Sequence, residues 1–106
     1  MDEREFNAAA EAMLARIETA LEARAGDDFD FEIAPGGVIE IEFDDGSKII
    51  VNRHTAAREI WVAARSGGYH FRPDGERWVG TRGGEELMAA LSRCLGEQAG
   101  HPVKLE

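Results

Sequence analysis

Hydrophobic residues recur with two different periods along this chain, a helical period near both ends and a period of two in between. From Glu5 to Arg24, apolar side chains repeat at three- and four-residue steps, which is typical of one buried face of a helix. That face consists of Phe6, Ala10, Met13, Leu14, Ile17 and Leu21. Gly26 is placed to end this helix. A second apolar helical face follows Gly83 and Gly84, and it consists of Leu87, Met88, Leu91, Cys94 and Leu95.

Between these two helices, apolar and polar residues alternate in short runs that turn residues separate. The expected strands cover residues 29–33, 38–43, 48–53, 58–63, 69–72 and 76–80. Short strands joined by tight turns favour an antiparallel meander. The sequence therefore predicts an α+β fold, a two-layer α/β sandwich in which two terminal helices cover one face of a five- or six-stranded antiparallel sheet. All 106 residues are expected to form a single domain.

Composition narrows the class of protein further. Cys94 is the only cysteine, which excludes an internal disulfide and a cysteine-based zinc site and fits a reducing compartment. No apolar run is long enough to span a membrane, and the acidic start of the chain is unlike a signal or transit peptide. We therefore expect a soluble, cytoplasmic protein that does not act at a membrane.

Negative charge is concentrated in the first third of the chain. Ten carboxylates and three arginines lie between Asp2 and Glu32, so this segment carries seven of the nine net negative charges. Such a surface repels the phosphates of nucleic acid, which excludes that class of partner. It favours either a cationic protein surface or hard metal cations, which prefer carboxylate oxygen.

Three of these carboxylates share one side of the first helix. Glu11, Glu18 and Glu22 fall within an arc of about 40°, at the flank of the apolar face. If the first strand lies at the edge of the sheet, these residues and those that follow form one acidic ridge: Glu11, Glu18, Glu22, Asp27, Asp28, Asp30 and Glu32. Its metal sites would be exposed, weak and poorly selective. The alternative interpretation is a solvated face that keeps the protein soluble.

A second candidate surface lies on the opposite face of the sheet. Ile60 and Val62 share one face of their strand, so Trp61 points the other way, toward the face that the helices leave open. Asn52 is expected on that same face, which would make a polar surface around an aromatic side chain and so a protein-binding patch. Equally compatible with the sequence is a Trp61 covered by loops or the chain end, or packed against Ile50.

No arrangement of residues indicates a catalytic centre. His54, His70 and His101 are far apart in the sequence, so a histidine-based metal site is not expected. Neither a Ser/His/Asp nor a Cys/His arrangement is evident, and the glycine pairs do not form a phosphate-binding motif. We therefore expect a protein that is not an enzyme.

The order and spacing of several short motifs resemble the bacterial frataxin (CyaY) family over nearly the whole chain. The matching residues are Glu5-Phe6, Pro35 to Val38, Phe43, Asp45 to Arg53, Ile60 to Ala63, Gly67 to Phe71, Trp78 and Gln98 to Gly100. The resemblance implies an α-β-α order with two near-parallel helices on an antiparallel sheet. It also implies an iron-binding regulator of iron–sulfur cluster assembly that docks on the cysteine desulfurase and modulates delivery to the scaffold protein.

Carried over residue by residue, the family's weak iron sites fall on the acidic ridge and bind Fe2+ or Fe3+, with other divalent cations as competitors. Partner contacts fall on Glu18, Glu22, Asn52 and Trp61. The protein is expected to be a monomer that iron can drive to self-associate. The sequence leaves two alternatives open, an iron donor to the scaffold and a ferroxidase-type iron store. This chain departs from the family pattern at Ala23-Arg24-Ala25 and at His54-Thr55-Ala56.

Overall fold

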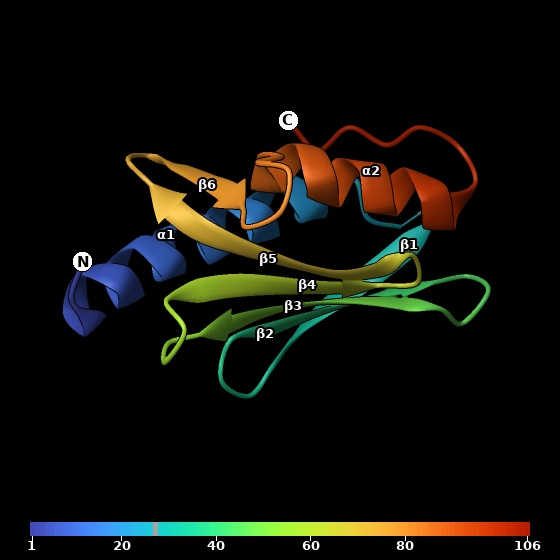
Figure 1. Ribbon diagram of the computed structural model, residues 1–106. Coiled ribbons are helices and arrows are strands. Elements are labelled where there is room, and N and C mark those ends of the chain that lie inside the picture. Colours follow the sequence, from blue (N-terminus) through green and yellow to red (C-terminus); the bar gives the residue numbers. More distant parts are fainter. Residues whose placement is uncertain (27) are drawn as a thin grey trace.

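Two helices pack on one face of a six-stranded sheet in the computed structural model, which describes residues 1–26 and 28–106 (Figure 1). The elements are α1 (Glu3–Glu22), β1 (Phe29–Ala34), β2 (Val38–Phe43), β3 (Lys48–His54), β4 (Glu59–Ala64), β5 (Gly67–Asp74), β6 (Arg77–Gly80) and α2 (Leu87–Ala99). The two-layer α+β fold that the sequence predicts is therefore confirmed.

Helix α1 begins with a capping box. Asp2 accepts a hydrogen bond from the backbone N–H of Glu5, and the Glu5 carboxylate accepts one from the N–H of Asp2, so two otherwise unpaired donors are satisfied. The helix ends at Glu22, a little before the position that Gly26 suggested, and Ala23 is its C-cap. Gly26 instead begins the entry into β1, where its N–H donates to Phe29 O.

All six strands are antiparallel, and their order across the sheet is the order of the sequence, so β1 and β6 form the two edges. Several strand boundaries differ from the prediction by one or two residues, and two of these differences have a clear physical reason. Arg58 has a positive φ of 57° and belongs to the turn before β4. Strand β5 continues through Pro73, because only β6 pairs with it there and the absent proline N–H breaks no bond to β4.

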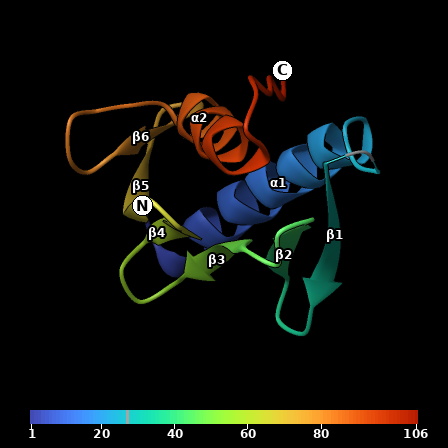
Figure 2. The ribbon, with the colours of Figure 1, turned by 90° about the vertical axis from the view of Figure 1, so that its right-hand side faces the viewer.

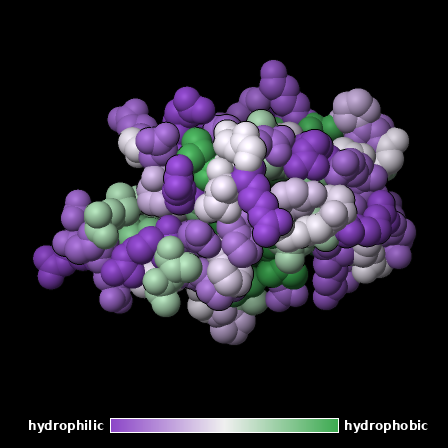
Figure 3. Space-filling view, viewed as in Figure 1, coloured by the Kyte–Doolittle hydropathy of each residue, from purple (hydrophilic) through white to green (hydrophobic). Residues whose placement is uncertain are grey.

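The hydrophobic core lies between the helices and the sheet. It contains the apolar face of each helix, including Cys94, and the alternate strand residues that point toward the helices, such as Ile41, Val51 and Phe71. On the face shown in Figure 3, hydrophilic side chains dominate and hydrophobic ones appear only in small separate groups. Apart from Met1, Ile33 on β1 is the one exposed large hydrophobic residue in the described part of the chain.

Residues 101–106 lie against the helices, as their apolar residues suggest. Leu105 is buried in the core, and its N–H donates to Ser92 Oγ on α2. Arg16 on α1 forms an ion pair with Glu106, and Arg24 Nε donates to Lys104 O. The tail therefore links the two helices of the layer that covers the sheet.

Candidate functional site

The three ridge carboxylates of α1 do not all have the same surroundings. Helix α1 crosses the sheet so that its C-terminal end approaches β1 (Figure 2). Glu22 is exposed and Glu18 is half-buried, whereas Glu11 Oε1 lies 3.5 Å from Arg53 Nη1 on β3. That Arg53 nitrogen is buried and has no hydrogen-bond partner among the described residues, so Glu11 supplies its nearest negative charge. Glu11 thus has a structural partner.

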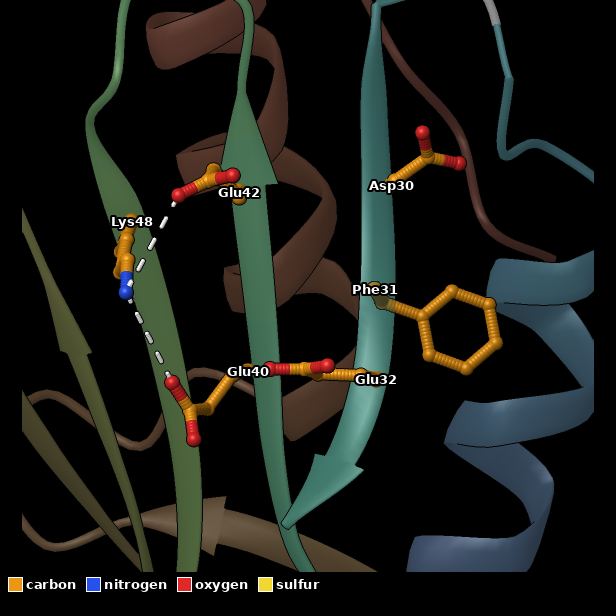
Figure 4. Close-up of a pocket in the computed structure, with 6 residues that line it drawn as sticks. All are labelled: Asp30, Phe31, Glu32, Glu40, Glu42 and Lys48. Carbon is orange, nitrogen blue, oxygen red and sulfur yellow. Dashed lines mark ion pairs between the residues drawn. The ribbon is translucent and has the colours of Figure 1, made fainter.

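Strand β1 lies at the edge of the sheet, as the ridge hypothesis required, but its carboxylates lie on the face away from α1. Asp30 and Glu32 are exposed, and Phe31 between them points toward the helix (Figure 4). The strand edge therefore separates the helix carboxylates from those of β1. The acidic surface wraps around this edge from the helix layer to the open face of the sheet.

On the open face, Asp30 and Glu32 lie opposite two further carboxylates on β2. The register pairs Asp30 with Glu42 and Glu32 with Glu40, so like charges face each other twice. Lys48 on β3 is the nearby cation, with Nζ 3.8 Å from Glu40 Oε1 and 4.0 Å from Glu42 Oε2 (Figure 4). We call Asp30, Glu32, Glu40 and Glu42 the sheet-face acidic patch. It borders a shallow cavity of about 160 Å³.

Glu40 and Glu42 were missing from the site predicted from the sequence, although a signal for them was present. Their strand alternates apolar and acidic residues, which places both glutamates on the open face. The pairing with β1 brings them beside Asp30 and Glu32, and that pairing depends on the turn between the strands.

The acidic loop before β1 is tied to the C-terminal tail. Asp28 Oδ2 lies 2.7 Å from His101 Nε2, and the ring's other nitrogen is 3.2 Å from Pro102 O. The hydrogen bond to Asp28 and, secondly, the one to Pro102 O raise the pKa of His101. Asp27, the remaining ridge residue, lies outside the described residues.

The described carboxylates form pairs, not closed metal-binding clusters. Across residues 1–26 and 28–106, no three His, Cys, Asp or Glu side chains are close enough together to hold a metal ion. The pairs available to a cation are Glu18 with Glu22, one helical turn apart, and the two cross-strand pairs of the sheet-face acidic patch. Their donors are hard carboxylate oxygens, which suit iron or other hard cations at exposed positions.

Trp61 lies on the open face, as predicted, between two histidine rings. The His54 ring centroid is 3.4 Å from that of Trp61 and the His70 centroid is 4.2 Å away, both nearly parallel to the indole. Trp61 Nε1 donates to Glu59 Oε1 at 2.7 Å, and the same oxygen is 3.5 Å from His70 Nδ1. Asn52 is the cross-strand partner of Trp61.

This stack was not foreseen from the sequence, because its histidines come from different strands. Adjacent antiparallel strands bring His54, Trp61 and His70 together although they are widely spaced along the chain. Trp61 is covered by the two imidazoles, which hold the indole in a fixed orientation on the sheet.

None of the described helices has the length and hydrophobicity needed to cross a lipid bilayer.

Comparison with known proteins gives one consistent result. Residues 1–101 match the family model described as a frataxin-like domain. The chain is 62% identical over 105 residues to a protein of Dechloromonas aromatica named iron-sulfur cluster assembly protein CyaY, covering 99% of both chains. A protein of Cupriavidus pinatubonensis with the same name is 55% identical, over 99% of this chain and 96% of its own.

A solved structure agrees with these sequence matches. Frataxin from Psychromonas ingrahamii, described as a member of the CyaY protein family, superposes with a TM-score of 0.87 at 26% identity. The match covers 100% of this chain and 99% of that one. The similarity therefore extends over both helices and the entire sheet.

Proposed function

The chain belongs to the frataxin-like family, and from that premise we propose that it is a non-catalytic, iron-binding regulator of iron–sulfur cluster assembly. In this proposal it docks on the cysteine desulfurase and modulates the delivery of sulfur and iron to the scaffold protein. The observation that carries the proposal is the accumulation of carboxylates on both sides of the β1 edge, on α1 and on the sheet-face acidic patch.

The charge balance supports docking on a cationic surface. Lys48 is the cation that contacts the sheet-face acidic patch, and it is shared by two of the four carboxylates. Like charges held side by side repel one another, and a basic partner relieves that repulsion when it binds. The negative charge thus attracts a cationic partner over a distance, and the carboxylates pair with the basic side chains of that partner on contact.

Iron would bind at the same carboxylates as cargo, held by pairs and not by a cage. Glu18 with Glu22 and Glu32 with Glu40 each offer two carboxylates to one cation, and water would complete the coordination. Weak, exchangeable binding follows from the small number of protein ligands. Because iron neutralises the charge that attracts the partner, iron occupancy would tune the affinity for the desulfurase.

The stack around Trp61 would provide a second contact, on the scaffold protein. Its indole is fixed between His54 and His70, so little conformational entropy is lost when a partner packs against the stack. Asn52, directly opposite Trp61, offers an amide for hydrogen bonding. The two surfaces lie on the same sheet, so one molecule can contact two partners together.

The test measures binding to the purified desulfurase by isothermal titration calorimetry, at low and high salt and with or without Fe2+. We expect affinity to fall steeply with salt, because the screening length drops from about 10 Å at 0.1 M to about 3 Å at 1 M. Glu18→Lys combined with Glu22→Lys should abolish binding. The matched control is Asp74→Lys with Glu76→Lys, which makes the same charge change at exposed positions near the opposite edge of the sheet.

The control variant should bind as the natural protein does. Binding that is indifferent to salt, or that survives the double charge reversal on α1, would show that the acidic surface is not the docking surface. An affinity unaltered by Fe2+ would remove iron from the regulation while leaving the docking in place.

A further inference from the structure

The outer edge of β1 has backbone hydrogen-bonding groups that no described part of the protein uses. Two contacts fix which residues turn these groups outward. Gly37 N–H donates to Ala34 O in the turn, so the backbone groups of Ala34 point toward β2. Phe43 N–H donates to Ser47 O, so the backbone groups of Phe43 point toward β3 and away from β1. In an antiparallel ladder the bonded pairs alternate, so Glu32 and Asp30 bond to β2. The N–H and C=O groups of Phe31 and Ile33 therefore point away from the sheet.

The first carbonyl group of β1 that points away from the sheet already accepts a hydrogen bond. Phe29 O accepts the N–H of Gly26, so the chain itself covers this end of the edge. Beyond it, neither Phe31 nor Ile33 forms a backbone hydrogen bond to any other described residue outside the sheet. In Figure 2 the lower part of β1 forms the border of the molecule, with no helix or loop beyond it.

The two faces of this edge differ sharply in chemistry. Toward the helix layer lie Phe31, which is half-buried, and Ile33, which is 45% exposed. Toward the open face lie Asp30 and Glu32, backed by Glu40 and Glu42. A strand added here would therefore meet apolar side chains on one face and carboxylates on the other.

We propose that β1 accepts an extended segment of a partner protein as a seventh, antiparallel strand, in which basic residues alternate with apolar ones. The basic side chains would lie beside Asp30 and Glu32, and the apolar ones beside Phe31 and Ile33. The identification of the partner as a cationic protein rests on the proposed function, and strand addition gives the mode in which it binds.

A second copy of this chain is a poor occupant of the same edge. Pairing two β1 strands antiparallel would bring the carboxylates of one copy against those of the other, and like charges across strands are destabilising. Charge on an edge strand is a recognised device against self-association. The same charge selects a basic strand, so the edge discriminates between partners.

The experiment uses a defined probe, a seven-residue peptide with blocked ends that alternates lysine and valine. Amide hydrogen exchange is followed by NMR on the whole protein. We expect the peptide to slow exchange at Phe31 and Ile33, while Asp30 and Glu32, which already bond to β2, change little. A peptide of the same composition with its lysines and valines in separate blocks is the sequence control.

A second peptide tests how much the backbone hydrogen bonds to β1 contribute to binding. In a strand added antiparallel to β1, the valines share a face with Phe31 and Ile33 and their N–H groups point at β1. Methylating the valine nitrogens removes those donors and keeps every charge. We expect about thirtyfold weaker binding, which corresponds to the loss of two hydrogen bonds of ordinary net strength. Equal affinity of the two alternating peptides would overturn strand addition.

Two variants of Ile33 make a matched pair. Ile33→Pro removes an N–H that bonds nothing in the sheet, whereas Ile33→Ala shortens the side chain and keeps the N–H. The proline variant should lose more peptide affinity than the alanine variant. If the proline variant does not fold, the methylated peptide on the natural protein still decides.

The same exchange measurement with the desulfurase separates this inference from the proposed function. Binding of the desulfurase with slowed exchange at Phe31 and Ile33 supports both. Binding without that change overturns strand addition alone. Absence of desulfurase binding, with the peptide still slowing exchange, rejects the proposed function and leaves the edge as a site for another basic segment.

Discussion

At the scale of single residues, Gln98 is a buried polar side chain that forms several hydrogen bonds to the sheet. It is the one buried polar or charged residue among those described, and its side chain reaches two turns of the sheet from α2. Its Oε1 accepts from Arg65 N at 3.0 Å, and its Nε2 donates to Ser47 Oγ at 2.9 Å and to Lys48 O at 3.3 Å. One amide therefore connects α2 to both turns.

Gln98→Ala should destabilise the fold by about 1–3 kcal/mol, because part-buried backbone groups of Arg65 and Lys48 lose their hydrogen-bond partner. Urea unfolding followed by circular dichroism measures the change. The neighbouring Glu97→Ala, at an exposed position, should stay within about 0.5 kcal/mol of the natural protein. Equal effects of the two substitutions would mean that the turns do not depend on this amide.

The pair of His101 and Asp28 predicts a pH dependence of stability. The raised pKa of His101 means that protonated histidine is favoured in the folded state. Its contribution is fully present below the ordinary histidine pKa of about 6.5 and is lost as pH rises through the higher folded value. The melting temperature of the natural protein should therefore exceed that of His101→Gln by more at pH 5.5 than at pH 9.

Asp28→Asn should behave in the same way, because it removes the acceptor that raises the histidine pKa. A gap between the natural protein and His101→Gln that stays constant across this pH range would contradict the assignment.

At the scale of elements, the C-terminal tail is a structural part of the helix layer. Leu105 is 4% exposed within the core and its N–H donates to Ser92 on α2, while the adjacent Glu106 pairs with Arg16 on α1. Leu105→Ala should destabilise the fold by about 2–5 kcal/mol, the range for removing a large buried side chain. Lys104→Ala is the control, since its contact with Arg24 uses the backbone carbonyl. Denaturant unfolding that gives the two variants equal stability would show that the tail is dispensable.

The elements themselves were largely predictable from the hydrophobic pattern. The period of the apolar residues identified both helices and five strands, because each element buries one face against the other layer, and it left open the sixth strand that the structure has. The residues at which the elements begin and end were harder to predict. Arg58 occupies a turn with positive φ, a conformation set by the tight connection and not by its own preference.

Side-chain clusters that cross strands were less predictable than the elements. The alternation on β2 placed Glu40 and Glu42 on the open face, but only the strand register sets them opposite β1. The same holds for His54 and His70, which the sheet brings to either side of Trp61. Which residues meet depends on turn geometry, and the periodicity of one strand does not contain that information.

At the scale of the whole molecule, a formal net charge of −9 opposes folding while it favours binding to a cationic partner. Like charges repel locally where Glu32 faces Glu40 across the strands. Glu32→Gln should therefore stabilise the protein by roughly 0.2–1 kcal/mol, since like charges directly opposite are destabilising. Glu32 has no ion pair among the described residues, so no attraction is lost.

Thermal unfolding at low and high salt checks this prediction. The gain should shrink as salt is added, because salt already screens the repulsion in the natural protein. Glu76→Gln, at an exposed position in the turn between β5 and β6, should change stability little at either salt concentration. A loss of stability in Glu32→Gln would show that this carboxylate is held by an attraction.

Under the proposed function, the position of Cys94 limits what the protein itself can do with the sulfur that is transferred. It is the only cysteine of the chain, it is 1% exposed, and its burial raises the pKa of the thiol. A thiol accepts a persulfide sulfur only as an accessible thiolate. The folded protein therefore offers no accessible thiolate to a persulfide, and under the proposed function its influence on sulfur transfer would be exerted on the cysteines of its partners.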